Sequence, residues 1–239
     1  MNFLKTISVS MFVTLLSVST SAVAGLTTVS TFINEKNDCK DFFDNDSGIG
    51  INKTGGSGFS DCKIYSEDEN EVQYDIAWVL SKFDVDSGDY EEGAKFNNQM
   101  AKVDWEFNGN GTNLSNSASG NWTFNNSNVD IYYWIAKTGK GYNLFWTVND
   151  SAINNGTCSA FDGTNNSVSD SNLSLACISS AVAVNEGTYL TPNEKGLSHL
   201  TFFGKEEPAP AVVQVSEPGM LTLFGLGIAG LLLGRRKTK

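Results

Sequence analysis

Two short clusters of acidic side chains, with glycine and serine between them, have the composition of a metal-binding loop. The first runs from Asp41 to Gly48 and the second from Asp84 to Glu92. Carboxylate oxygens at alternating positions are the hard ligands that Ca²⁺ prefers. Neither cluster fits an EF-hand loop, because the glycine and the last acid stand at the wrong positions. An acidic turn explains both clusters equally well, so calcium is a weak hypothesis, and no other metal or cofactor is predicted.

Aromatic rings suggest a second chemistry, the stacking of sugar rings. Residues 131–135 read Ile-Tyr-Tyr-Trp-Ile, so an extended strand there carries large apolar side chains on both faces. If only one face is core, Tyr132 and Trp134 stand exposed on the other as a glycan platform. If the strand is covered on both sides, both rings are packing residues. The covered strand is the favoured interpretation, and the platform stays open as the alternative.

Histidine chemistry is restricted because the chain has one histidine, His199. A histidine metal site or a Ser-His-Asp triad needs imidazole close to several partners. His199 lies in the run from Gly196 to Gly204, which predicts a strand, and we expect a packing or hydrogen-bonding role for it. Glycosidases need only two carboxylates at a set separation, but no pair stands out among the acids. We therefore predict no catalytic residue and no enzyme.

Four cysteines are present, an even number, which in an exported protein indicates disulfides. Three pairings are open, and local pairing is the economical one: Cys39 with Cys62 and Cys158 with Cys177. No histidine or basic cluster flanks any of the four, so a reactive thiol is disfavoured.

The elements that carry these residues are predicted from alternating hydrophobicity. Between residues 71 and 83, Val72, Tyr74, Ile76, Trp78 and Leu80 form one side of a period-two pattern, and Val103, Trp105 and Phe107 do the same over 101–108. Further strands are predicted over 120–125, 129–136, 142–148 and 197–203, with a hairpin connection at Lys137–Gly141. With many glycines and Asn/Ser-rich turns, the pattern predicts an all-β fold, an antiparallel, jelly-roll-like β-sandwich, over residues 25–204.

This central region is one domain by length and strongly acidic. Over residues 25–204, 10 lysines against 24 aspartates and glutamates give a net charge of −14, and there is no arginine. Nucleic-acid binding depends on basic side chains that displace counterions from phosphates, so nucleic-acid partners are not expected.

The N-terminal residues 1–24 have the layout of a secretory signal peptide. Lys5 precedes an apolar run of about a dozen residues, too short for a membrane-spanning helix, and the segment ends in Ala-Val-Ala. We expect signal peptidase to cleave between Ala24 and Gly25.

The C-terminal residues 216–239 consist of a short motif, an uncharged apolar segment and a basic end. From Gly219 to Gly234 no residue is charged, which predicts a short hydrophobic helix of roughly 24 Å. The basic end that follows is expected to stay cytoplasmic. Residues 205–215, which contain prolines and glutamates, fit a semi-rigid linker to the domain.

Together these parts resemble the PEP-CTERM sorting signal of exosortase substrates. The matching positions are Glu217, Pro218, Gly219, Arg235 and Arg236, while Ser216 stands where the family usually has proline. The resemblance implies a transient association with the inner membrane, cutting near Glu217-Pro218 by an exosortase, and release or transfer to the cell surface or exterior. A plain C-terminal anchor is the alternative.

The central region also resembles a set of PEP-CTERM proteins without established catalytic residues. Its matching pieces include Asp38-Cys39, Trp105-Glu106-Phe107 and the run from Gly196 to Gly204. We expect a non-enzymatic surface or extracellular-matrix protein of a biofilm. Two alternatives stay open: a carbohydrate-binding module for exopolysaccharide, and a hydrolase with an acidic site.

Overall fold

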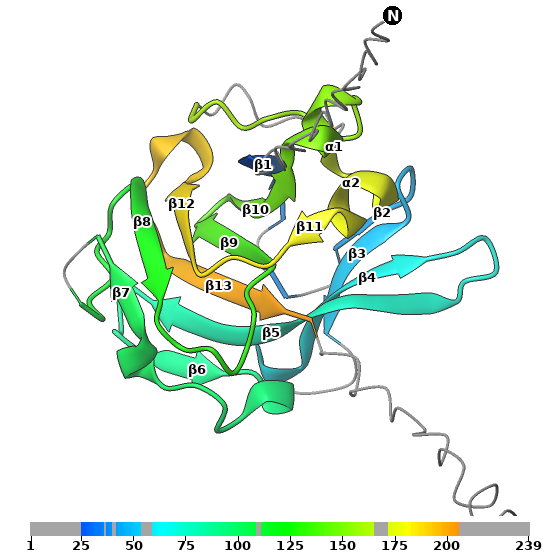
Figure 1. Ribbon diagram of the computed structural model, residues 1–239. Helices are drawn as coiled ribbons and strands as arrows, with labels where there is room; N and C mark the ends of the chain where they lie inside the picture. Colours follow the sequence, from blue (N-terminus) through cyan, green and yellow to red (C-terminus); the bar gives the residue numbers. More distant parts are fainter. Residues whose placement is uncertain are drawn as a thin grey trace, which may run out of the picture.

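The chain folds mainly into antiparallel β-structure (Figure 1). The structure is a computed structural model and describes residues 25–35, 37–39, 42–53, 59–108, 111–164 and 172–205. The signal peptide and the sorting segment predicted from the sequence lie outside these residues, as does Asp41.

Thirteen strands and two one-turn helices follow one another along the described chain. Their order is β1 (Leu26–Ile33), β2 (Phe42–Asp44), β3 (Ile49–Lys53), β4 (Cys62–Glu67), β5 (Gln73–Asp84), β6 (Tyr90–Glu92), β7 (Trp105–Phe107), β8 (Ser119–Phe124), β9 (Tyr133–Thr138), β10 (Gly141–Asn149), α1 (Asp150–Asn154), α2 (Leu175–Ser179), β11 (Ala181–Val182), β12 (Glu186–Leu190) and β13 (His199–Gly204).

Most of these strands form one large curled sheet, which resembles half of a barrel. Its strand order is β1-β10-β9-β13-β5-β4-β3-β2, and the short strands β11 and β6 pair with β10 and β5. A second sheet has only three strands, in the order β12-β8-β7. The last strand, β13, lies in the interior of the large sheet between β9 and β5, so the C-terminal part of the domain is essential to the sheet's continuity.

Both faces of the central strands are covered, and two cores result. In β9, Tyr133 and Ile135 face the first core, whereas Trp134 and Ala136 face the second. Every residue of β9 is buried, and so is nearly every residue of β10. A strand buried on both faces reads as a continuous apolar run and not as an alternating one.

The first core lies on one face of the large sheet, strands β3 and β4 included, and α2 also contributes to it. It contains Ile49, Ile64, Tyr142 and Trp146 together with all four cysteines. The second core lies between the other face and the small sheet. Aromatic rings dominate it: Phe83, Trp105, Trp122, Trp134, Phe145 and Phe202 are all buried there.

The predicted antiparallel β-fold is confirmed, and each strand predicted from alternation has a counterpart in the structure. The hairpin between β9 and β10 is also confirmed, with Thr138 paired to Gly141 across a two-residue turn. The arrangement differs from a jelly-roll-like sandwich, because one sheet is large and curled and the other has three short strands. Sequence patterning does not define strand order, which depends on long-range pairing.

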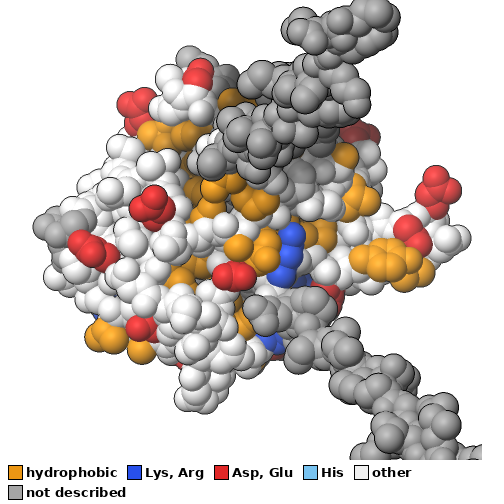
Figure 2. Space-filling model, viewed as in Figure 1, with side chains coloured by type: hydrophobic (Ala, Val, Ile, Leu, Met, Phe, Trp, Pro, Cys, Tyr) orange, Lys and Arg blue, Asp and Glu red, His pale blue; other side chains and the backbone are white. Residues whose placement is uncertain are grey.

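Three residues that alternation placed on a buried face are exposed. Val103 has 80% of its surface exposed, because Lys102–Asp104 form a 3₁₀ turn before β7 and do not extend that strand. Val72 and Tyr74 are exposed because the β4–β5 hairpin extends beyond both cores, where Figure 2 shows a hydrophobic patch.

Candidate functional site

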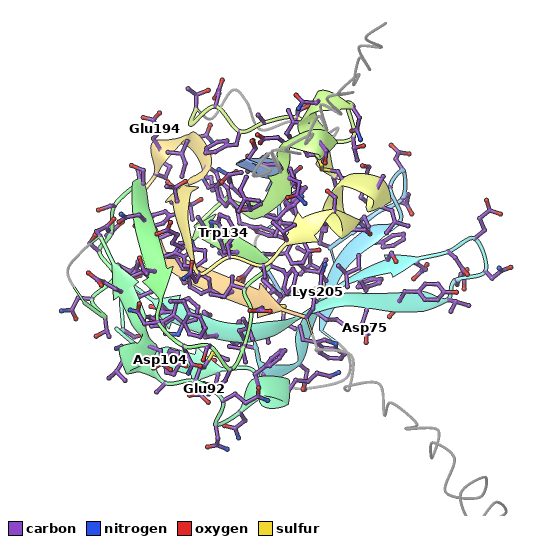
Figure 3. The ribbon with its side chains drawn as sticks, in the orientation of Figure 1. Asp75, Glu92, Asp104, Trp134, Glu194 and Lys205 are labelled. Carbon is purple, nitrogen blue, oxygen red and sulfur yellow. A yellow bond between two sulfur atoms is a disulfide. The ribbon has the colours of Figure 1, made fainter. Side chains whose placement is uncertain are left out.

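The proposed aromatic platform is not formed, because Trp134 is fully buried. Its ring stacks on Phe145 at 5.8 Å and meets Trp122 edge-on at 5.2 Å. Its Nε1 donates a hydrogen bond of 2.8 Å to the carbonyl oxygen of Thr188 in β12 (Figure 3). The platform hypothesis is therefore wrong for Trp134: the small sheet covers this face of β9.

Tyr132 is half-buried and lies beside the end of the described chain. The ammonium of Lys205 lies 4.4 Å from the centre of the Tyr132 ring, a cation–π contact. Burial lowers the pKa of Lys205 below its ordinary value. Without Trp134 beside it, Tyr132 does not form the two-ring platform that the sequence left open.

The strongest concentration of reactive groups is a buried cluster of Asp38, His199 and Thr201. Asp38 Oδ2 accepts a hydrogen bond of 2.8 Å from Thr201 Oγ1 and lies 2.9 Å from His199 Nε2. Burial alone would raise the pKa of Asp38, but the attraction of His199 and the hydrogen bonds from His199 and Thr201 outweigh it and hold that pKa below its ordinary value. The predicted role of His199 as a packing and hydrogen-bonding strand residue is confirmed.

The order of groups in this cluster does not suit nucleophilic catalysis. In a triad the imidazole lies between the hydroxyl and the carboxylate, so that it can take the hydroxyl proton. Here the carboxylate of Asp38 lies between His199 and Thr201, and all three residues are buried. The cluster instead joins the segment after β1 to the last strand, β13.

Both predicted disulfides are confirmed. Cys39 is bonded to Cys62 with Cα atoms 5.4 Å apart, and Cys158 to Cys177 at 5.2 Å. The first bond ties the segment after β1 to the start of β4, and the second ties the turn after α1 to α2. Both pairs close short loops, which is the local pairing that the sequence favoured.

Sequence reasoning missed Asn172, which is fully buried at the base of the second disulfide loop. Its Nδ2 donates to the carbonyl oxygens of Ser30 and Ser159, at 2.9 and 3.0 Å, and its Oδ1 accepts from the Ser159 amide at 2.6 Å. The bond to Ser30 attaches this loop to β1, and the two bonds with Ser159 close the loop on itself. The sequence gives no sign of it, because Asn172 lies among many asparagines and serines.

The acidic clusters are turns whose carboxylates bond backbone amides. Asp44 Oδ2 accepts from the Ser47 amide at 3.0 Å, and Gly48 completes the β2–β3 turn with a φ of 67°. Asp84 Oδ1 accepts from the amides of Asp86 and Ser87 in the turn before β6. Such hydrogen bonds are those of an acidic turn, which the sequence left open as the alternative to a calcium site.

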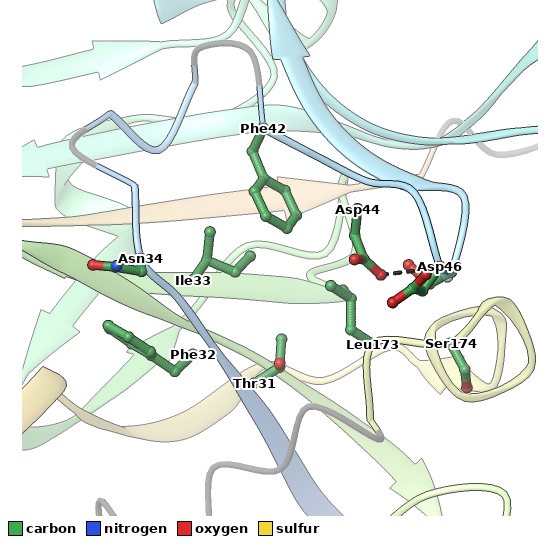
Figure 4. A pocket seen from close by; sticks show the side chains of 10 residues that line it. Thr31, Phe32, Ile33, Asn34, Phe42, Asp44, Asp46, Leu173 and Ser174 are labelled. Atoms are coloured by element: carbon green, nitrogen blue, oxygen red, sulfur yellow. Dashed lines mark hydrogen bonds between the residues drawn. The ribbon is translucent and has the colours of Figure 1, made fainter.

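Asp44 and Asp46 line one end of a groove of about 490 Å³ beside β1 (Figure 4). Its other walls mix apolar side chains such as Phe42 and Leu173 with polar ones such as Thr31. Within the described residues, no three His, Cys, Asp or Glu side chains lie close enough to share a metal ion. The groove thus offers two carboxylates from one turn, fewer than the six to eight oxygen ligands that calcium takes.

A second groove lies along the small sheet, and we call it the β8–β12 groove. It consists of two adjoining cavities of about 440 and 610 Å³, which share Asn121 and Thr188 as lining residues. Asn121 pairs with Thr188 across the two strands, and Thr123 pairs with Glu186. These side chains place hydroxyl, amide and carboxylate groups on the floor of the groove, whose lining also includes the largely buried Trp122.

The opposite wall of the β8–β12 groove comes from the loop after α1 and from β1. The amide of Phe161 donates a hydrogen bond of 2.9 Å to the carbonyl oxygen of Thr28, and its ring lies edge-on to Phe145 at 5.4 Å. Glu194 stands at one end of the groove (Figure 3). The alternation of polar residues with Trp122 in β8 was visible in the sequence, but the loop that makes this face a groove was not.

Comparisons with known proteins match only the C-terminus. Residues 214–237 match the family described as "PEP-CTERM protein-sorting motif". No curated protein and no solved structure matches the chain. Among the described residues no helix is long and apolar enough to cross a membrane. The chain therefore carries a PEP-CTERM protein-sorting motif, which implies an exported protein processed by an exosortase.

Proposed function

We propose that this protein is a non-enzymatic component of the cell surface or extracellular matrix. The observation that carries the proposal is the sorting motif at residues 214–237, which directs a disulfide-bonded domain out of the cell. The interior supports a structural role, since the imidazole of His199 is buried and bonded to Asp38. Disulfides stabilise domains in oxidising compartments such as the cell exterior.

The sorting step has a direct test in the host with an active exosortase. Glu217→Ala combined with Pro218→Ala is expected to leave a longer, membrane-associated form that keeps Arg235 and Arg236. A charge-preserving Lys239→Arg variant, altered in the basic end but outside residues 214–237, serves as the control and is expected to be processed normally. Unchanged size and distribution of the double variant would mean that the segment is only an anchor.

A carbohydrate-binding role is the second candidate, and the β8–β12 groove is the observation that favours it. Its floor presents Asn121, Thr123 and Thr188, whose amide and hydroxyl groups can both donate and accept hydrogen bonds, as sugar hydroxyls require. Small-ligand sites combine such polar groups with apolar walls, which Phe161 provides here. The basic side chains needed for a strongly anionic polymer are not among the groove's lining residues, so a neutral or amino-bearing glycan is the expected class.

This role is testable with the exported protein on immobilised host exopolysaccharide and on a glycan array. Asn121→Ala with Thr188→Ala is expected to reduce retention at least tenfold without changing the melting temperature. Asn113→Ala removes an exposed amide outside the groove and is expected to bind like the wild type. If wild-type protein is not retained on any glycan, or if both variants bind alike, the carbohydrate-binding role is wrong and the matrix role is unaffected.

A further inference from the structure

The first described residue, Gly25, lies directly against the carboxylate of Asp150 at the start of α1. A methyl group built on Gly25 would overlap Asp150 Oδ2 and lie 3.0 Å from its Cγ. The carbonyl oxygen of Gly25 accepts a hydrogen bond of 3.0 Å from the Asp150 amide. Thr27 Oγ1 donates a bond of 2.6 Å to Asp150 Oδ1. The beginning of β1 is therefore fixed beside one half-buried acid, whose carboxylate lies where a side chain at position 25 would begin.

Cleavage after Ala24 would change the charge at this contact. In the precursor the nitrogen of Gly25 is an uncharged amide, whereas after cleavage it is an α-ammonium with an ordinary pKa of about 7.7–8.0. The nitrogen and the methyl position are bonded to the same Cα, so the nitrogen lies within about 5 Å of the carboxylate. Opposite charges within about 4–6 Å stabilise each other.

We propose that Asp150 binds the new amino terminus of the processed chain, pairing its carboxylate with the α-ammonium of Gly25. Thr27 holds one carboxylate oxygen, and the other, Oδ2, faces Gly25. The hydrogen bond from the Asp150 amide to the Gly25 carbonyl oxygen keeps the ammonium close to the carboxylate. Rotation about the Cα–C bond of Gly25 adjusts the direction of the ammonium. Removal of the signal peptide thus adds a contact that the precursor lacks, and it strengthens the edge strand β1 only in the processed protein.

The ion pair is expected to be of modest strength, because the site is partly open to solvent. Exposed ion pairs contribute little, and a small gain in a domain of this size corresponds to a rise in melting temperature of about 1–3 °C. The proposal depends on the predicted cleavage site, which mass spectrometry of the exported protein tests separately. An N-terminus at any residue other than Gly25 would overturn it and leave the proposed matrix function intact.

The decisive experiment compares four proteins in detergent, each ending at Lys239. Two start at Gly25 and two retain residues 20–24, and each start is prepared with Asp150 and with Asp150→Asn. Asparagine keeps an oxygen that accepts the Thr27 hydrogen bond but removes the charge, so it is a matched control. Melting is followed by the fluorescence of the buried tryptophans.

With Asp150, the chain that starts at Gly25 is expected to melt about 1–3 °C above the extended chain. With Asp150→Asn, that difference is expected to disappear. Equal melting temperatures in the Asp150 pair would overturn the proposal. A difference that persists with Asp150→Asn would also overturn it, since the extension would then act sterically and not through charge.

Discussion

The two cores of this domain are held together by different means. The first core contains all four cysteines, and both disulfides close loops within it. The second core contains no cysteine and is an aromatic cluster in which Trp122 packs against Trp134 and Phe202. The small sheet is fastened to the large one by this packing and by two side-chain bonds, from Trp134 to Thr188 and from Asn143 to Leu190.

This difference follows from the segments that build each core. The first core includes short loops and small hairpins around β2 and α2, which bury few large side chains of their own. A disulfide restricts the unfolded chain and stabilises such a segment without a larger apolar area. The second core joins two sheets through large rings, which bury much area in the folded state. Each core therefore has a specific vulnerability, reduction in one and truncation of a ring in the other.

The largest effect is expected from Trp134→Ala. Truncating a buried tryptophan costs about 3–5 kcal/mol, and here it also leaves Thr188 in β12 without its indole donor. Denaturant unfolding of the exported protein measures the loss. Tyr132→Ala, on the adjacent half-buried position, is the control and should lower stability by a clearly smaller amount. Comparable losses from both variants would contradict the assignment of Trp134 to the second core.

Removal of a disulfide is expected to have the next largest effect. Cys39→Ala with Cys62→Ala, or Cys158→Ala with Cys177→Ala, should each lower stability by roughly 3 kcal/mol, since the loops contain 23 and 19 positions. Hydrogen exchange should increase in the first core and change little in β7 and β8. Equal loss of protection in both cores would mean that they unfold as one unit.

A smaller effect, with a characteristic pH dependence, is expected from Asp38→Asn. Hydrogen bonds to a charged group contribute about 1.5–3 kcal/mol, so the variant should lose about that much at neutral pH. The pKa of Asp38 is lowered in the folded state. Its contribution is therefore complete above the unfolded pKa, about 3.9, and is lost as pH falls through the lower folded value.

The difference in stability between wild type and Asp38→Asn should accordingly shrink below about pH 4. Urea titrations at several pH values measure it, and Asp46→Asn, on an exposed turn, is the control. A difference that grows on acidification would mean that Asp38 has a raised and not a lowered pKa.

The sequence predicted the β-class, the disulfides and the interior role of His199, because each depends on local pattern or on residue counts. Alternation in β8 and β5 revealed strands, and the spacing of the cysteines favoured local loops. The pairing of Asp38 with His199 joins residues 161 positions apart, and no local pattern encodes such a contact. The buried state of Trp134 likewise depends on β12, more than 50 residues later in the chain.

The candidate groove was the least predictable feature for the same reason. The polar face of β8 is visible as Ser119, Asn121 and Thr123 alternating with buried rings. Its second wall, at Phe161, belongs to a loop that is held by a hydrogen bond to Thr28 and by ring packing on Phe145. A binding surface built from non-adjacent segments has no sequence signature of its own.

The smallest effect is expected from Val103→Thr, which tests where the second core ends. Alternation places Val103 on the same face as Trp105 and Phe107, and burial there would make a hydroxyl costly. In the structure Val103 is 80% exposed and its neighbours are in a 3₁₀ turn, so the substitution should change stability by less than about 0.5 kcal/mol. Phe107→Ala, at the third and fully buried residue beyond the turn, is the matched contrast and should cost about 3–5 kcal/mol. Denaturant unfolding curves of the two variants locate this edge of the second core. A loss of stability above about 1 kcal/mol for Val103→Thr would show that β7 begins earlier and that Val103 is buried, as the alternation predicts.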